Sequence, residues 1–204
     1  MQAPAAIIEE LAPDDPAARA AVVETLARAF RDAPLNVAVI RGSPERRLRT
    51  NRHGMRGLLA SARGGATVWT ARPDDLTGAL IGVAPHCFPL PPPPLALQLR
   101  SLVGQGWFTL RRWGAVYQDL LQLHPQEPHW YLAVIGVRPS HQGRGLGSAL
   151  LGAFLERVDR EGMPAYLESD RAENLPFYRR AGFEVATRTE TAGIPIWCMW
   201  RSPK

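Results

Sequence analysis

A glycine-rich turn between an apolar strand and an amphipathic helix constrains this chain more than any other sequence feature. The run HWYLAVIGV at 129–137 predicts a buried strand, and residues 147–161 repeat apolar side chains at helical spacing. Between them stand Gly143, Gly145 and Gly147. Glycines tolerate positive φ and let a ligand approach the backbone closely, and the N–H groups that open a helix are unpaired. The turn therefore predicts a cradle for a pyrophosphate.

The glycine spacing excludes two familiar nucleotide motifs. G-x-G-x-G differs from the G-x-G-x-x-G of dinucleotide-binding folds, and the turn lies far from the N-terminal position expected for that motif. The G-x-x-x-x-G-K-[ST] motif needs a lysine beside the turn, and the only lysine of the chain is Lys204. A glycine-rich turn that binds no ligand remains the alternative at this point.

Length and composition predict one domain over residues 1–204. The chain is 46% hydrophobic, so it can bury a core, and no apolar run approaches the roughly 18 to 20 residues that span a bilayer. The N-terminus lacks a basic n-region, and Cys87 and Cys198 are too few for a disulfide framework. We therefore expect a cytoplasmic protein without membrane contact and, since no C-x-x-C or histidine cluster occurs, without a metal. The net charge of +5 favours an anionic partner, either nucleic acid or a phosphorylated small molecule.

Elements on both sides of the turn predict a mixed sheet. Strand, helix and strand at 129–137, 147–161 and 165–169 have the spacing of a right-handed crossover between parallel strands, whereas the other strands look antiparallel. The remaining expected elements are a strand at 5–11, a helix that starts at Asp14 or Asp15 and is closed by Pro34, a helix capped by Ser43, strands at 66–71 and 78–84 joined by a turn at 73–75, a helix at 173–181 ended by Gly182, and strands at 183–190 and 195–200.

Residues 85–128 interrupt this pattern. Five prolines within 89–94 exclude a central strand, and helical patterns follow at 95–103 and 107–123. The second helix repeats Trp, Tyr and Leu at helical spacing. This stripe indicates either a core-facing surface or the wall or lid of an acceptor site.

Three motifs in the C-terminal half resemble the GNAT superfamily of acyl-CoA-dependent acetyltransferases. They are V-x-P followed by Q-x-x-G-x-G at 137–147, YLES followed by ENLPFY at 166–178, and AGFE at 181–184. The resemblance is firm from about 128 to 200 and looser before that, and the C-terminal half is similar to puromycin N-acetyltransferase. Ala33 stands where the puromycin-acetylating sequences have a tyrosine, which argues against puromycin as the acceptor.

The resemblance implies an α/β domain of α+β character. Its mixed, mostly antiparallel sheet would be splayed between two parallel central strands, with helices on both faces. Residues 129–182 would form the acetyl-CoA-binding core, and the insertion at 85–128 would lie on the acceptor side. The implied cofactor-binding residues are Ile135, Gly136 and Val137 along the pantetheine arm, Gln142, Gly143, Arg144, Gly145, Leu146, Gly147 and Ser148 around the pyrophosphate, and Asn174 beside the arm.

Acyl transfer from a thioester also needs an acid, a base and an oxyanion donor. The resemblance implies that Tyr178 protonates the departing thiolate, and a phenol with a pKa near ~10 carries its proton at neutral pH. A core tyrosine on an amphipathic helix is the alternative. The oxyanion donor would be the Val137 N–H. Glu168 is the first candidate for the base, directly or through water, beside Glu127 and His129; the alternative for Glu168 is a structural hydrogen-bonding role.

These observations predict an acetyl-CoA-dependent N-acetyltransferase that acetylates a primary amine of a small molecule by direct attack in a ternary complex. A non-catalytic acyl-CoA sensor is one alternative. A nucleic-acid-associated module is another, because Arg49, Arg52 and Arg56 share a helix face, but no reader motif accompanies them, so we expect no nucleic-acid partner. The Trp and Pro content of 89–117 is compatible with a homodimer.

Overall fold

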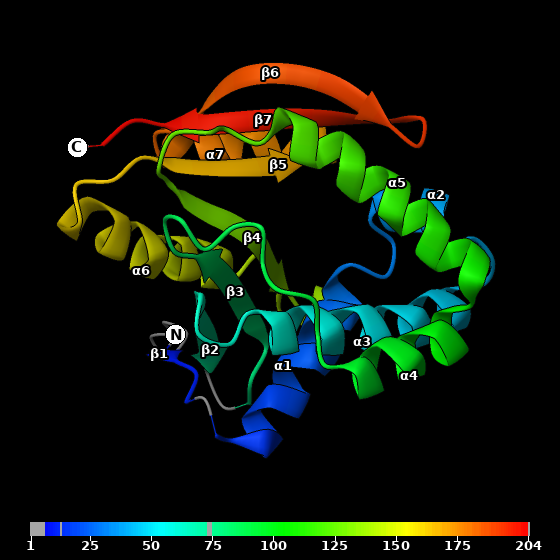
Figure 1. The fold of residues 1–204 in the computed structure, drawn as a ribbon. Helices are drawn as coiled ribbons and strands as arrows, with labels where there is room; N and C mark the ends of the chain where they lie inside the picture. Colours follow the sequence, from blue (N-terminus) through cyan, green and yellow to red (C-terminus); the bar gives the residue numbers. More distant parts are fainter. Residues whose placement is uncertain (1–6, 13, 73–74, 204) are drawn as a thin grey trace.

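The fold is organised around one seven-stranded mixed sheet with helices on both faces (Figure 1). The computed structural model describes residues 7–12, 14–72 and 75–203. Within these residues the strands are β1 (Ile7–Glu10), β2 (Ala66–Arg72), β3 (Gly78–Val83), β4 (Trp130–Val137), β5 (Ala165–Ser169), β6 (Glu184–Thr191) and β7 (Ile194–Arg201). Their order is β1-β2-β3-β4-β5-β7-β6, and only β4 and β5 are parallel neighbours. The predicted fold class is confirmed.

The helices begin and end close to the predicted residues, with one addition. They are α1 (Pro16–Ala29), α2 (Pro34–Ile40), α3 (Pro44–Ser61), α4 (Leu95–Gln105), α5 (Trp107–Leu123), α6 (Leu146–Arg160) and α7 (Leu175–Arg180), with single turns η1 (Pro139–His141) and η2 (Ala172–Asn174). Asp15, one of the two predicted starts, caps α1 by accepting from the Ala18 N–H at 2.8 Å. Residues 5–6 of the predicted first strand and 73–74 of the predicted turn lie outside the described residues.

The prediction that Pro34 closes the first helix is wrong. The helix α1 already ends at Ala29, and Pro34 is the first residue of α2. Proline is compatible with both positions, because it stops a preceding helix and also suits the first turn of a new one. The α2 helix matters for the site, because Leu35 packs against buried side chains of β5 and β7.

The two central parallel strands diverge soon after they begin. Trp130 pairs with Ala165 and Tyr131 with Tyr166, and no further pair joins β4 to β5. On the other side β4 stays paired with β3 through Val137, with a register shift between Ile81 and Gly82 that leaves one extra residue in β4. The sheet is therefore splayed between β4 and β5, as predicted (Figure 1).

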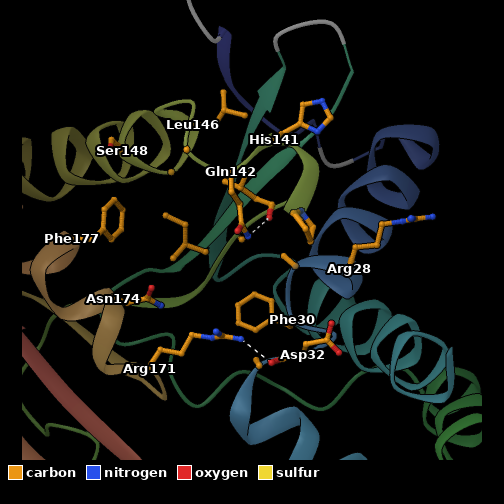
Figure 2. Close-up of a pocket in the computed structure, with 18 of the residues that line it drawn as sticks. Arg28, Phe30, Asp32, His141, Gln142, Leu146, Ser148, Arg171, Asn174 and Phe177 are labelled. Atoms are coloured by element: carbon orange, nitrogen blue, oxygen red, sulfur yellow. Dashed lines mark hydrogen bonds between the residues drawn. The ribbon is translucent and has the colours of Figure 1, made fainter. Parts of the chain in front are cut away.

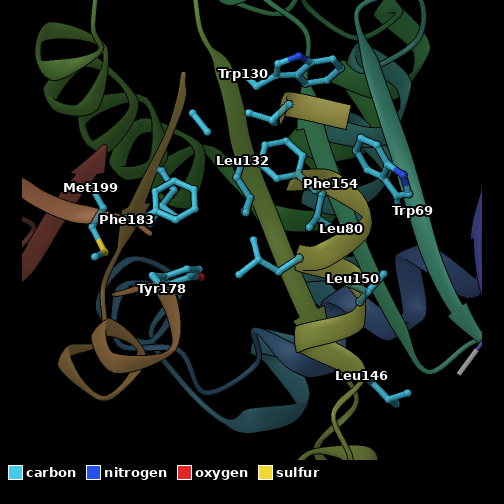
Figure 3. Close-up of a cluster of buried hydrophobic side chains, with 14 of the residues drawn as sticks. Trp69, Leu80, Trp130, Leu132, Leu146, Leu150, Phe154, Tyr178, Phe183 and Met199 are labelled. Carbon is cyan, nitrogen blue, oxygen red and sulfur yellow. The ribbon is translucent and has the colours of Figure 1, made fainter. Parts of the chain in front are cut away.

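Two cores hold the open edge of β4 in place. On one face, α6 packs Phe154 edge-on against Trp69, with ring centroids 5.8 Å apart, and the same core includes Leu80, Leu132 and Tyr178 (Figure 3). On the other face, α1 buries Val22 and Leu26 against alternate residues of β3. Because β4 is clamped from both sides, it stays in position without a partner on its open edge.

The insertion forms α4 and α5. The helix α4 packs on α3, whereas Leu120 and Leu123 of α5 cover a buried cluster on β5 and β7. The start of α5 is exposed: Trp107 and Phe108 keep 64% and 72% of their surface accessible. Of the predicted stripe, Leu120 packs on that cluster, whereas Trp107 and Tyr117 remain exposed. No helix in the described part of the chain is both long and apolar enough to cross a bilayer.

Candidate active site

A cavity of about 610 Å³ opens where β4 and β5 separate (Figure 2). Segments far apart in sequence form its walls: the end of α1 with the turn to α2, the last residues of β4, the glycine-rich turn with the start of α6, and the segment from β5 to α7. Eleven of the predicted site residues line it: Ile135, Gly136, Val137, Gln142, Gly143, Gly145, Leu146, Gly147, Ser148, Asn174 and Tyr178.

The glycine-rich turn has the backbone geometry of an anion cradle. Gly143 and Gly145 have φ of 76° and 80°, and Gly145 caps α6 in the left-handed conformation. A Cβ atom added at either glycine would meet no atom within 4 Å, so the surface above the turn is open. The first intrahelical bond runs from the Ala149 N–H to the Gly145 carbonyl at 3.0 Å. The preceding N–H groups of the first turn thus remain available to a ligand.

The open edge of β4 offers a second row of backbone groups. The Arg138 N–H donates to the Thr77 carbonyl at 2.8 Å, on the side of β3. Successive residues of a strand direct their N–H and C=O to opposite edges, so Val137 and Ile135 present theirs to the gap. The Gln142 side chain donates to the Val137 carbonyl at 3.1 Å and ties the turn to the strand (Figure 2).

Tyr178 lies on α7 at the back of this cavity. Its ring packs against Phe177 and Phe183, and only 6% of the residue is exposed. Burial, and to a smaller degree the nearby Asp170, raises the pKa of Tyr178 above its usual value, so the phenol keeps its proton at neutral pH. Tyr178 can therefore act as a proton donor, but not as a base.

Several lining residues were not anticipated from the sequence, among them Arg28, Phe30 and Asp32 from the α1 side and Arg171 from the β5 side. The Arg171 guanidinium donates to the Asp32 carbonyl at 2.8 Å and bridges the cavity (Figure 2). No motif or spacing connects residues 28–33 with 170–178, because only the tertiary fold brings them together. Ala33 also lines the cavity.

Two predicted residues lie elsewhere. The Arg144 side chain is exposed and donates to the Ser140 carbonyl at 3.2 Å, so only its position in the turn relates it to the cavity. Glu168 is on the face of β5 covered by α5, whereas its neighbour Leu167 belongs to the core that includes Tyr178. The proposed acid and base therefore approach the splayed strands from opposite faces of the sheet.

The other base candidates differ from each other in burial. The His129 ring is 7% exposed, and its Nδ1 is 2.7 Å from the Glu127 backbone oxygen, whereas the Glu127 residue itself is exposed. Desolvation lowers the pKa of His129, so its ring is neutral at pH 7. In the part of the chain that the structure describes, no group of three or more His, Cys, Asp or Glu side chains could hold a metal ion.

Comparison with known proteins assigns the family. The model of the acetyltransferase (GNAT) family matches residues 56–183, more than half of the chain. A solved structure from Corynebacterium glutamicum, described as histone acetyltransferase HPA2 and related acetyltransferase, superposes with a TM-score of 0.74 at 21% identity and covers 98% of this chain and 97% of that one. The chain belongs to the GNAT family of acetyltransferases.

The curated relatives are similar to this chain over only part of their length. A Streptomyces bingchenggensis mycothiol acetyltransferase is 31% identical over 62% of this chain and 47% of its own length. An uncharacterized N-acetyltransferase of Schizosaccharomyces pombe is 33% identical over 37% of this chain and 32% of its own. The chain thus spans less than half the length of these relatives. They support the family, and the named activity among them is that of mycothiol acetyltransferase rather than puromycin N-acetyltransferase.

Proposed function

We propose that this protein transfers an acetyl group from acetyl-CoA to a primary amine of a small molecule. The observation that carries the proposal is the single cavity shared by the glycine-rich turn, the open edge of β4 and the buried phenol of Tyr178. A diphosphate fits the turn because positive-φ glycines leave its N–H groups uncovered. The thioester of acetyl-CoA supplies the activated acyl group.

The residues on this path have separate tasks. The turn from Gln142 to Ser148 would hold the pyrophosphate, and the backbone of Ile135 to Val137 would extend the pantetheine arm along the gap. Asn174, at the start of α7, lies on the wall of the same cavity and would contact that arm. These backbone contacts would place the thioester where β4 and β5 part.

The reaction follows from the positions of the polar groups. A neutral amine attacks the thioester carbon, the C–N bond forms, and the Val137 N–H stabilises the oxyanion. The C–S bond then breaks, and Tyr178 donates its proton to the thiolate. Glu168 takes a proton from the amine on the opposite face of the sheet, and holding both substrates in one site supplies much of the rate.

A small-molecule acceptor is favoured by the mycothiol acetyltransferases among the relatives, because that name points to a small-molecule acceptor. Asp32 and Asp170 provide carboxylates on the cavity wall beside α2. The similarity to puromycin N-acetyltransferase stays a prediction, with Ala33 in place of that family's tyrosine on the wall.

Measuring CoA thiol release with a panel of amines tests this function. The panel contains puromycin, aminoglycosides, polyamines and peptide N-termini. We expect turnover with at least one small-molecule amine and saturable acetyl-CoA binding by calorimetry. Tight acetyl-CoA binding without turnover on any amine would favour the sensor, and absence of acetyl-CoA binding would refute both interpretations.

Replacing Tyr178 by phenylalanine separates catalysis from binding. Tyr178→Phe keeps the ring that packs on Phe183 and removes only the hydroxyl. We expect turnover to fall by roughly 100-fold or more, because general acid catalysis contributes about that much, with acetyl-CoA affinity unchanged. Unchanged turnover would show that the thiolate is protonated by another group.

A further inference from the structure

A buried polar cluster lies under the C-terminal end of α5, outside the cavity of Tyr178. Its central residue is His124, the residue that follows α5, which is 8% exposed. The His124 ring packs edge-on against Tyr131 and Tyr166, with centroids 4.9 Å and 5.1 Å apart. Its Nδ1 is 3.9 Å from the Glu168 carboxylate, whose side chain is 9% exposed. The insertion thus brings an imidazole to the proposed base.

The hydrogen bonds around the two histidines fix their tautomers. A backbone carbonyl only accepts, so His129 Nδ1, 2.7 Å from the Glu127 oxygen, carries a hydrogen. The neutral His129 ring must then accept at Nε2. His124 Nε2 lies 3.1 Å from that atom and is therefore the donor. In a neutral His124 ring, this leaves Nδ1 without a hydrogen.

His124 Nδ1 is the atom that faces Glu168, and it is one of the few buried side-chain polar atoms in the described residues without a hydrogen-bond partner. A nitrogen lone pair on Nδ1 cannot form a hydrogen bond with a carboxylate, because both groups only accept. One added proton at Nδ1 would instead give the ring a donor toward Glu168 and leave every other bond in place. The geometry therefore leaves one open position for a proton between the two side chains.

Phe88, also from the insertion, holds the imidazole plane. The two rings stack with centroids 3.8 Å apart and an interplanar angle of 23°. An aromatic face attracts a cation, so this stacking stabilises the protonated ring as well as its orientation. Phe88 and His124 lie 36 positions apart in the sequence, at the two ends of the segment that was expected on the acceptor side.

We propose that His124 is a positioning residue for Glu168. The His124 ring orients the Glu168 carboxylate, and its Nδ1 receives the proton that Glu168 removes from the acceptor amine. This inference rests on the proposed function and extends it to the insertion. An acceptor ammonium gives one proton to the Glu168 carboxylate, which passes it to His124 and becomes a carboxylate again. The neutral amine attacks, and the thiolate takes the Tyr178 proton. Glu168, again a carboxylate, removes the second amine proton to solvent, and the Tyr178 phenolate regains a proton from solvent. The proton on His124 is finally released to solvent, so the reaction yields amide, CoA thiol and one proton.

The other titratable groups around Glu168 stay uncharged. Burial, with a smaller contribution from Glu168, raises the pKa values of Tyr131 and Tyr166, and burial also raises the pKa of the Cys198 thiol. Desolvation lowers the pKa of His129. Among these described neighbours, His124 is the one whose ring nitrogen faces Glu168 without a hydrogen-bond partner.

Two amide variants test the inference in the full-length protein. The Gln amide of His124→Gln reaches the position of Nε2 and keeps the donor to His129, whereas the Asn amide of His124→Asn reaches the position of Nδ1 and keeps the contact with Glu168. Neither can accept the proton. We expect kcat to fall by about 10- to 100-fold in both, with the KM for acetyl-CoA unchanged. A merely structural role predicts that one of the two amides restores the rate.

The pH dependence adds a readout that packing alone would not change. The deficit of His124→Gln should shrink as the pH rises toward the pKa of the acceptor amine, because more acceptor then arrives neutral. His53→Gln is the matched control, since this partly buried histidine of α3 lies outside both the cavity and the cluster. A constant deficit at all pH values would overturn the proton-accepting role.

A measurement without substrate decides the pairing independently. In nitrogen NMR spectra of the histidine rings, Glu168→Gln should change the chemical shift of His124 Nδ1 and leave that of His129 Nδ1 nearly unchanged, because His124 Nδ1 is the atom that faces the carboxylate. An unchanged chemical shift of His124 Nδ1 would overturn the pairing. Loss of turnover in Tyr178→Phe with normal turnover in His124→Gln would refute the inference alone, whereas a wild type inactive on every amine would refute the proposed function.

Discussion

The segment 129–182 and the insertion 85–128 would contribute to the proposed site by different means. The first supplies mainly backbone: N–H groups of a glycine-rich turn and the open edge of β4, held between two cores. The insertion supplies side chains, His124 and Phe88, that reach β5 from the other face of the sheet. A site formed by backbone groups can be predicted from local sequence, because the positions of the glycines determine it. A side-chain site depends on how distant segments pack.

The largest effect expected from this difference is at Gly145. Its φ of 80° is accessible to alanine only with strain of about 1–2 kcal/mol, although a Cβ would meet no atom within 4 Å. We expect Gly145→Ala to distort the turn and weaken acetyl-CoA binding by about tenfold, as measured by calorimetry. Because the added methyl group is otherwise unhindered, the loss would come from the backbone.

Gly152 offers the matched control. It lies in the middle of α6, in helical conformation, and a Cβ there would also meet no atom within 4 Å. Gly152→Ala should leave acetyl-CoA affinity unchanged and raise the stability of the helix by about 0.5–1 kcal/mol. If both variants bind acetyl-CoA as tightly as the wild type does, the turn is not the cradle.

The sequence predicts the parts of the structure that depend on local sequence better than the parts that depend on contacts between distant segments. The strand at 130–137, the turn and the helix α6 were expected within one or two residues, since apolar periodicity and glycines are local properties. The splay was expected from family resemblance, and the register confirms it. The start of α2 at Pro34 was missed because proline both ends and begins helices.

The candidate site also contains residues that motifs predict and residues that they do not. Gly143, Gly145 and Tyr178 were found from motifs and do line one cavity. Arg171 and Asp32, which bridge that cavity, and His124, which contacts Glu168, have no motif. Their roles arise from contacts between residues 44 to 139 positions apart, and no periodicity within one segment reports such contacts.

A smaller effect, on stability, is expected from changes in the helices that support the insertion. The helix α4 rests on α3, and α3 is tied to α1 by Arg52, whose guanidinium donates to Glu24 at 2.7 Å and 2.8 Å. This hydrogen bonding lowers the pKa of Glu24 from 4.5 to about 2. A carboxyl whose pKa is lower in the folded state stabilises the protein above its unfolded pKa and loses that contribution as the pH falls toward 2.

Replacing Glu24 by glutamine should therefore make the free energy of unfolding depend less on pH under acidic conditions. The wild type should lose stability between about pH 4.5 and pH 2, and Glu24→Gln should show a shallower dependence over that interval, measured by denaturant unfolding at several pH values. At neutral pH the variant should be less stable than the wild type, because the ion pair is absent. Equal slopes would mean that the pair persists in the unfolded chain.

The smallest effect is expected on the outer face of the insertion. Val103 is 88% exposed on α4, beside an apolar surface that includes Leu99 at 55%. In a monomer, Val103→Asp removes almost no buried area, so the free energy of unfolding should change by less than about 0.5 kcal/mol. The Trp and Pro content of the segment is compatible with a homodimer. If this face joins two copies, a buried carboxylate would oppose association and the mass in light scattering would fall from dimer to monomer. A dimer that survives Val103→Asp would exclude this face as the contact, leaving α4 as a solvent-exposed support for the residues that reach β5.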